Sequence, residues 1–261
     1  MIRNAEPADY PVFATLFREL EVDDKAPTID RFTSDLANET LISERDGQVN
    51  GYVSFYTLSV VGYVRNLVVA PAARNGGVGA ELMRAAADVL RARGVGEWHL
   101  NVKWDNAPAI RLYENLGMQV EHRSTVLRVP WKTIDALPHE PATVLPVAPE
   151  EDDDIERALG LLAGRIAMGR VRPGRVLIQL RDDQCAPVGF ASFDPKLPGA
   201  MPFRVVRPAL AGTLLAALRP HSTGEHLQIV ADDDTGLSDL LISVGAEVRL
   251  QLLHYRGALP E

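Results

Sequence analysis

The sequence of 261 residues contains a single cysteine, Cys185, and no excess of basic residues. One cysteine can form neither an internal disulfide nor a thiolate metal cluster, so we expect a reducing cytoplasm and no metal. Lys and Arg number 27 against 35 Asp and Glu, for a net charge of −8. Nucleic-acid-binding surfaces are usually basic, so nucleic acid is not the expected partner. No apolar run is long enough to span a bilayer, and the first ten residues carry no apolar signal region, so no membrane partner is expected either.

Glycine, by contrast, is concentrated in residues 73–82, ARNGGVGAEL. The β-rich run Leu67–Val69 stands before this stretch and is stopped by Pro71, which predicts a strand and its end. Apolar residues at helical spacing follow from Val78 to Leu90, and Gly94 ends the predicted helix. A glycine-rich turn between a strand and a helix N-terminus is typical of a phosphate site, because bare N–H groups and the helix dipole favour an anion.

Arg74 adds a positive charge, and we interpret the stretch as a pyrophosphate cradle. The common nucleotide motifs do not fit it. No Lys-Ser or Lys-Thr follows the glycines, as a P-loop requires, and Leu82 stands where a dinucleotide motif needs its third glycine. The alternative is an ordinary glycine-rich turn that opens a helix.

The pattern Arg74-x-x-Gly77-x-Gly79 resembles the signature of the GNAT superfamily of acyl-CoA-dependent N-acyltransferases. A second stretch, DNAPAIRLYENLGM, supplies Asn106 near a helix start and Tyr113 two turns later, where that family carries an asparagine and a tyrosine. The predicted order over residues 2–130 is also that of the family: strand, two helices, three strands, helix, strand, helix, strand.

The resemblance implies an acyl-CoA site with its pyrophosphate beside Arg74. The N–H groups that would bind it belong to Asn75, Gly76, Gly77, Val78, Gly79 and Ala80. The pantetheine arm would run between the fourth and fifth strands, which splay apart in the family. It would bond the backbone of Leu67, Val68 and Val69, one of whose N–H groups would polarise the thioester carbonyl.

Two side chains have implied roles on the following helix. Asn106 would bind an amide of the arm, or would only cap the helix. Tyr113 would protonate the departing thiolate, a thiol of pKa ~8.5 facing a phenol of pKa ~10. A core aromatic is the alternative for Tyr113.

One departure concerns the base that takes the proton of the attacking amine. Many family members carry a glutamate at the start of the fourth strand, where this sequence has Arg65 and Asn66. The replacements left open are a water chain and four acidic residues: Glu97, Glu21, Asp23 and Asp24. The acidic stretch RELEVDDK is either a negative rim that attracts a cationic amine or a solvated helix end. His99 is interpreted as structural.

The second half reads as a degenerate copy of the first. Prolines near residue 140 predict a linker, so we expect a catalytic domain at 1–138 and a degenerate domain at 139–261. The strand-helix-Gly-strand pattern recurs with Gly245 opposite Gly117, but the cradle is reduced to Gly212 and Leu241 stands in the place of Tyr113. The alternative is an unrelated α/β domain.

The expected fold is thus α/β, an α+β arrangement on a mixed sheet, with two tandem GNAT-like domains. The expected function is transfer of an acyl group, with acetyl as first candidate, from acyl-CoA to a primary amine of a small molecule or peptide. The amine would attack directly in a ternary complex. The alternative is a catalytically inactive acyl-CoA sensor or regulatory protein, which the missing glutamate favours and Tyr113 opposes. A homodimer remains open.

Overall fold

The computed structural model describes residues 1–22 and 25–260, and these form two compact units. The first unit comprises Met1–Glu121 and His254–Glu261, and the second comprises His122–Leu253. The division therefore differs from the predicted 1–138 and 139–261. The chain leaves the first unit at His122, in the middle of a strand, and its last residues return to that unit.

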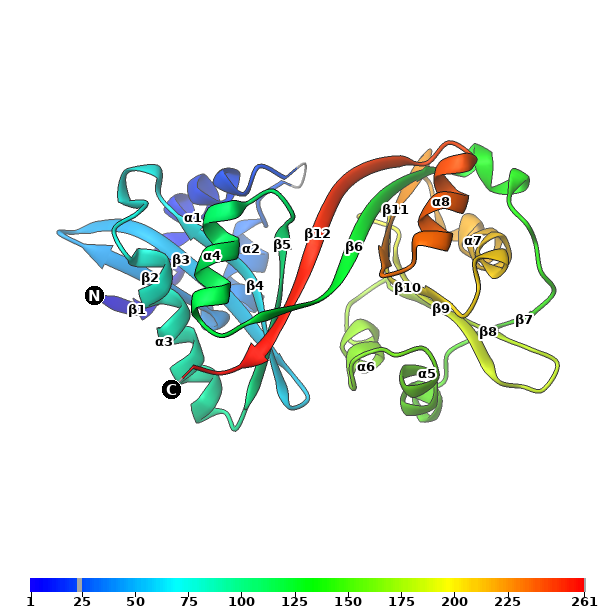
Figure 1. The fold of residues 1–261 in the computed structure, drawn as a ribbon, viewed down its shortest axis with the longest axis horizontal. Helices are drawn as coiled ribbons and strands as arrows, with labels where there is room; N and C mark the ends of the chain where they lie inside the picture. The colour runs from blue at the N-terminus through cyan, green and yellow to red at the C-terminus, as the bar shows by residue number, and fades with distance from the viewer. Residues whose placement is uncertain (23–24, 261) are drawn as a thin grey trace. The chain divides into compact units, whose positions relative to one another are not determined.

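The first unit has the predicted order of elements (Figure 1). Its helices are α1 (Tyr10–Phe17), α2 (Ile29–Arg31, continued by a π-turn over Phe32–Leu36), α3 (Val78–Ala92) and α4 (Ala107–Asn115). Its strands are β1 (Ile2–Asn4), β2 (Thr40–Arg45), β3 (Gln48–Leu58), β4 (Val61–Val69), β5 (Glu97–Lys103) and the start of β6 (Gln119–Pro130).

The second unit repeats this order, so the internal repeat read from the sequence is confirmed at the level of the fold. Its helices are α5 (Asp152–Ala158), α6 (Arg165–Arg170), α7 (Ala211–Leu218) and α8 (Thr235–Ser243). Its strands are β7 (Thr143–Pro146), β8 (Val176–Arg181), β9 (Pro187–Asp194), β10 (Gly199–Val205), β11 (His226–Asp232) and the start of β12 (Glu247–Ala258). Gly160 and Gly164, which lie between α5 and α6, take positive φ and separate these two helices.

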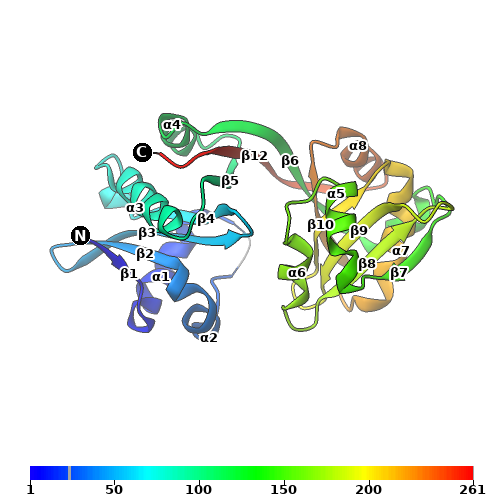
Figure 2. The same cartoon turned by 90° about the horizontal axis from the view of Figure 1, so that it is seen from below.

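Each unit is a mixed sheet between two layers of helices. In the first unit the strand order is β1-β2-β3-β4-β5-β12, antiparallel up to β4, with β4 and β5 parallel. Helices α3 and α4 cover one face, and α1 and α2 cover the other (Figures 1 and 2). In the second unit the order is β6-β11-β10-β9-β8-β7, with the parallel pair β10 and β11 in the corresponding place.

The last strand of each half joins the sheet of the other half. The outer neighbour of β5 is β12, through residues 254–258, which belong to the first unit. Strand β6 lies beside β11, with Pro130 opposite His226 and Ser124 opposite Asp232. The prolines near residue 140 lie between β6 and β7, but they carry no information about which sheet either strand joins.

Aromatic residues fill the core beneath α1 and α2. The ring centroid of Phe13 lies 4.6 Å from that of Phe32 and 4.7 Å from that of Tyr52. On the opposite face, α3 buries its apolar stripe, which consists of Val78, Leu82, Met83, Ala86, Ala87 and Leu90. The helical spacing predicted from the sequence therefore identifies the buried side of α3 correctly.

Close packing between α3 and β4 leaves no room for a side chain at Gly62. A Cβ there would lie 2.6 Å from Cδ1 of Leu90, which is fully buried. We expect Gly62→Ala to lower the free energy of unfolding by about 1–3 kcal/mol through overpacking, measured as an earlier urea midpoint. At Gly96 a Cβ meets no atom within 4 Å. Gly96→Ala should therefore change the free energy of unfolding by less than about 0.5 kcal/mol. Equal midpoints for the two variants would contradict this packing.

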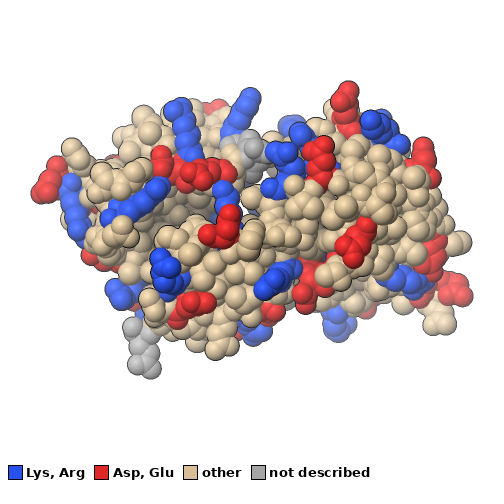
Figure 3. Space-filling model, turned by 45° about the horizontal axis from the view of Figure 1, so that its top comes forward, with Lys and Arg blue, Asp and Glu red and all other residues tan. Residues whose placement is uncertain are grey.

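Charges of both signs are interspersed over the face in Figure 3, where the described residues form no continuous patch of one sign. Among residues 1–22 and 25–260, no helix combines the length and the apolar character that crossing a membrane requires.

Candidate functional site

Strands β4 and β5 separate partway along their length. Their parallel ladder runs from Val61 opposite Glu97 to Val64 opposite Leu100 and ends there. Strand β4 continues to Val69 in register with β3, where Leu67 lies opposite Val53 and Val69 opposite Gly51. Over these described residues, the β5-facing edge of Leu67–Val69 therefore has no strand partner, which is the splayed geometry that the resemblance implies.

Strand β4 has a β-bulge against β3 at the point where β4 and β5 separate. The register between β3 and β4 shifts so that Ser54 opposes Asn66 and Phe55 opposes Val64, which leaves Arg65 as the extra residue. A bulge re-aims the backbone N–H groups around it. The Arg65 guanidinium lies 4.9 Å from the ring centroid of Tyr56, and its Nη2 is 3.6 Å from Oε2 of Glu39.

The glycine-rich turn leads from β4 into α3, as the sequence predicts. Asn75 and Gly77 have φ of 64° and 80°, both in the left-handed region, and α3 begins at Val78. The first intrahelical bond of the turn runs from the N–H of Glu81 to the carbonyl of Gly77, at 3.0 Å. The N–H groups of Val78, Gly79 and Ala80 therefore belong to the first turn, where no helical carbonyl can accept them.

Two glycines of the cradle differ from the expectation in detail. The N–H of Gly76 donates to the carbonyl of Ala73 at 3.4 Å, so it is not a bare donor. A Cβ on Gly79 would lie 3.2 Å from Cδ2 of Leu112 and 3.7 Å from Cγ2 of Val69. Gly79 is thus also needed for the close approach of α3 to α4 and β4.

Arg74 is held at the mouth of the cradle. Its Nη2 donates to Oε2 of Glu19 at 2.7 Å, and its Nε donates to the carbonyl of Val69 at 3.3 Å. Both side chains are solvent-accessible, so the ion pair between Arg74 and Glu19 adds little to stability.

Helix α4 carries the other two predicted residues. The side chain of Asn106 accepts from the N–H of Ala109 at 3.3 Å, so its role as an N-cap is confirmed. Tyr113 is 6% exposed, and its ring centroid lies 6.0 Å from that of Tyr255 in β12. Burial raises the pKa of the Tyr113 phenol above its ordinary value, so the phenol is protonated at neutral pH.

A polar network on β5 was not predicted as a whole. His99 is buried and its Nε2 bonds Oε1 of Glu97 at 3.0 Å, as its structural interpretation requires, and Asn101 donates to the hydroxyl of Tyr63 at 2.8 Å. The other partners, His254 and Arg256, come from β12. No local signal in the sequence could have found them, because they lie some 155 positions from β5.

The carboxylates considered as bases have different surroundings. Burial acts to raise the pKa of Glu97, but hydrogen bonds from Arg256 and His99 outweigh it and lower this pKa. Glu21 is exposed, with its backbone carbonyl bonded to Nζ of Lys103, and Asp23 and Asp24 lie outside the described residues. Burial raises the pKa of Glu39, the partner of Arg65, which the sequence did not single out.

Comparison with known proteins shows that the first unit is similar to acetyltransferases. Residues 2–118 match the model of the acetyltransferase (GNAT) family. A stretch of 74 residues is 40% identical to streptothricin acetyltransferase of Streptomyces lavendulae; the match spans 28% of this chain and 39% of that protein. The chain thus spans well under two thirds of that relative.

Two solved structures resemble nearly the whole chain. A GCN5-related N-acetyltransferase from Sphaerobacter thermophilus matches with a TM-score of 0.69 at 18% identity, covering 100% of this chain and 96% of the other. A tandem GNAT protein from the clavulanic acid biosynthesis pathway matches with a TM-score of 0.60 at 18% identity, covering 99% and 98%. The chain therefore has the GNAT fold in a tandem arrangement.

Proposed function

We propose that the first unit is the catalytic unit of an acyl-CoA-dependent N-acyltransferase. It would move an acyl group, with acetyl as first candidate, to the primary amine of a small molecule or peptide. Two features that occur together support the proposal. The β4–β5 ladder ends at Val64 and Leu100, and β4 is followed by Arg74 and the open N-terminus of α3. An extended thiol arm needs the first feature and a pyrophosphate needs the second.

The cradle would hold the pyrophosphate by backbone donors. Val78, Gly79 and Ala80 supply N–H groups at the positive end of α3. Arg74 supplies a charged donor once the pyrophosphate replaces Glu19 as its partner. The arm would then lie along Leu67–Val69 like an added strand. This brings the thioester to the bulge at Arg65, where a β4 N–H can meet the developing oxyanion.

In the reaction, the amine nitrogen bonds to the thioester carbonyl carbon and the carbon–sulfur bond breaks. The departing thiolate takes a proton, for which Tyr113 is the proposed donor, and the nitrogen loses a proton to a base. Tyr113 suits this role because its buried phenol stays protonated, while a thiolate desolvated in the same place is a stronger base than in water.

The second unit is proposed to bind no acyl-CoA. The start of α7, which corresponds to the cradle helix α3, packs against residues 137–140. A Cβ on Gly212 would overlap the carbonyl of Pro138, and Oγ1 of Thr213 donates to the carbonyl of Glu140 at 2.7 Å. An ion pair between Arg204 and Asp232 joins β10 to β11, where an arm would have to pass. Leu241 is fully buried in the place of Tyr113 and offers no proton.

Binding stoichiometry tests this difference between the units. We expect calorimetric titration of the full chain with acetyl-CoA to give about one site per chain. In the part of the chain that the structure describes, the start of α3 has open N–H donors beside Arg74, whereas the start of α7 packs against Pro138. A stoichiometry near two would contradict the degenerate interpretation of the second unit. Titration without any heat would contradict the acyl-CoA site itself.

The second candidate function is an acyl-CoA sensor without catalysis. Arg65 and Asn66 occupy the places where a strand-four glutamate would act as base, and the Glu97 carboxylate is engaged by Arg256 and His99. Saturable binding of acetyl-CoA without release of thiol in the presence of amines would favour the sensor over the enzyme.

A further inference from the structure

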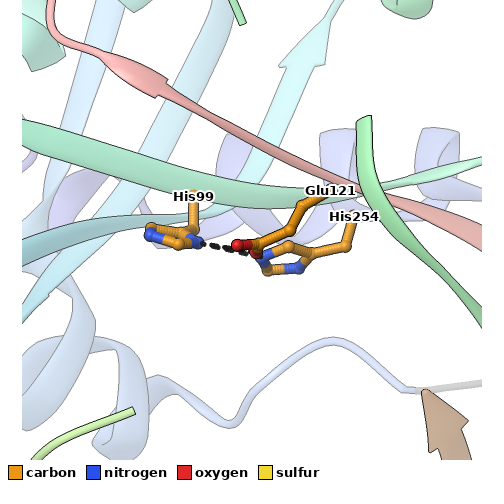
Figure 4. A group of neighbouring side chains, drawn as sticks. All are labelled: His99, Glu121 and His254. Atoms are coloured by element: carbon orange, nitrogen blue, oxygen red, sulfur yellow. Dashed lines mark hydrogen bonds and ion pairs between the residues drawn. The ribbon is translucent and has the colours of Figure 1, made fainter. Parts of the chain in front are cut away.

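Three side chains of kinds that can bind a metal ion lie together in the first unit, and none of them belongs to the proposed acyl-CoA site. His99 comes from β5, Glu121 from the start of β6 and His254 from β12 (Figure 4). Nδ1 of His99 and Nε2 of His254 are 2.9 Å apart. Oε2 of Glu121 lies 3.5 Å from Nε2 of His254 and 3.9 Å from Nδ1 of His99. The three donor atoms thus converge on one point.

The outer hydrogen bonds of the two rings set their tautomers. Nε2 of His99 lies 3.0 Å from Oε1 of Glu97, an acceptor, and therefore carries a proton. Nδ1 of His254 lies 2.8 Å from Oδ1 of Asn101, whose Nδ2 is turned to the hydroxyl of Tyr63. In two neutral rings, the lone pairs of the inner nitrogens then face each other.

Two facing lone pairs 2.9 Å apart repel unless a cation lies between them. A single proton between the two nitrogens would explain their contact but not the nearby carboxylate of Glu121. A metal ion explains all three ligand atoms and also the hydrogen bonds on the outer side of each ring. Imidazoles that bind metals donate their other N–H to a carboxylate or carbonyl, as both rings do here. Arg256 bonds Oε1 of Glu121 at 3.1 Å, which leaves Oε2 facing the histidines.

We propose that His99, His254 and Glu121 bind a divalent first-row transition ion, with zinc as the best match to two imidazoles and one carboxylate. At tetrahedral zinc, with bonds of about 2.0–2.2 Å, ligand atoms lie roughly 3.4 Å apart. The observed separations of 2.9, 3.5 and 3.9 Å bracket that value. Small side-chain rotations therefore suffice to place the ion between the three ligand atoms.

The surroundings suit a bound ion of this kind. His99 and His254 are 2% and 6% exposed, which shields the nitrogens from water. A depression that is open to solvent is lined by Glu121, one of the three proposed ligands, together with Glu97, Gln119 and Arg256. The ion would tie β12 to β5 and β6, and this proposal is independent of acyl transfer.

The test is zinc binding by the full chain after removal of metal with a chelator. We expect about one zinc per chain by calorimetry and a higher Tm on addition of zinc. Cobalt(II) should give the visible bands of four-coordinate nitrogen and oxygen ligation. His254→Gln should weaken zinc binding at least about 100-fold, and Glu121→Gln at least about tenfold.

Two control variants show whether a loss of zinc affinity is specific to the three-residue group. His221→Gln and Glu247→Gln change an exposed histidine and an exposed carboxylate outside the group and should leave zinc affinity unchanged. Glu121 is 37% exposed in its side chain, so Glu121→Gln tests the site even where His254→Gln does not fold. No zinc uptake, or equal uptake by all variants, would overturn the proposal and leave a shared proton between the two rings.

Discussion

Replacing Gly77 with glutamate raises the dissociation constant for acetyl-CoA at least about 100-fold, or about 2.7 kcal/mol. Gly77 is the N-cap of α3 with φ of 80°, and its Cβ direction is open, with only Oε1 of Glu81 at 3.9 Å. A carboxylate built there stands at the mouth of the cradle. It repels the pyrophosphate and competes for the N–H groups of the first turn. Calorimetric titration of the full chain measures the effect.

A control at the other end of the same helix separates repulsion from backbone strain. Gly94 has a similar φ of 78°, and a built Cβ there meets no atom within 4 Å. Gly94→Glu therefore carries a similar conformational cost, but it lies at the C-terminal end of α3, far from the cradle donors. It should leave the affinity within about twofold. Equal losses in both variants, or no loss in Gly77→Glu, would contradict the cradle assignment.

Replacing Tyr113 with phenylalanine lowers kcat by at least about tenfold, while acetyl-CoA affinity changes less than about twofold. The variant removes only the hydroxyl, and the buried ring keeps its packing against Tyr255. The thiolate then departs without a positioned proton donor. Steady-state kinetics and calorimetry on the same preparation separate the two quantities.

Tyr255→Phe is the matched control for Tyr113→Phe. Tyr255 is the other member of the ring pair, it is 1% exposed, and its hydroxyl donates to Oε1 of Glu114 at 3.3 Å. Loss of that bond should reduce stability slightly and leave kcat unchanged. A fall in kcat that is equal in the two variants would show that packing of the pair, rather than the Tyr113 proton, limits turnover.

Local features of the site could be predicted from the sequence because local chemistry determines them. The glycines of the cradle, the cap at Asn106 and the buried stripe of α3 each follow from residues within one or two turns. The tandem fold followed in the same way, since both halves repeat strand, helix and glycine signals at similar spacing.

Long-range features could not be predicted. Which strand lies beside β5 depends on pairing across the whole chain, and β6 and β12 have similar lengths and similar alternation. The exchange of these strands shifted the unit boundary from 138 to 121, and it brought His254, Tyr255 and Arg256 into the first unit. Packing of Gly212 against Pro138 likewise depends on a tertiary contact that composition does not record.

The most direct test of the account is release of CoA thiol from acetyl-CoA by the full chain, measured across a panel of primary amines with the unchanged protein and Gly77→Glu. The account predicts release that requires one class of amine, saturates with acetyl-CoA and falls to background in the variant. Saturable acetyl-CoA binding without amine-dependent release from any member of the panel would contradict the enzyme. It would favour an acyl-CoA sensor that lacks a base on strand four.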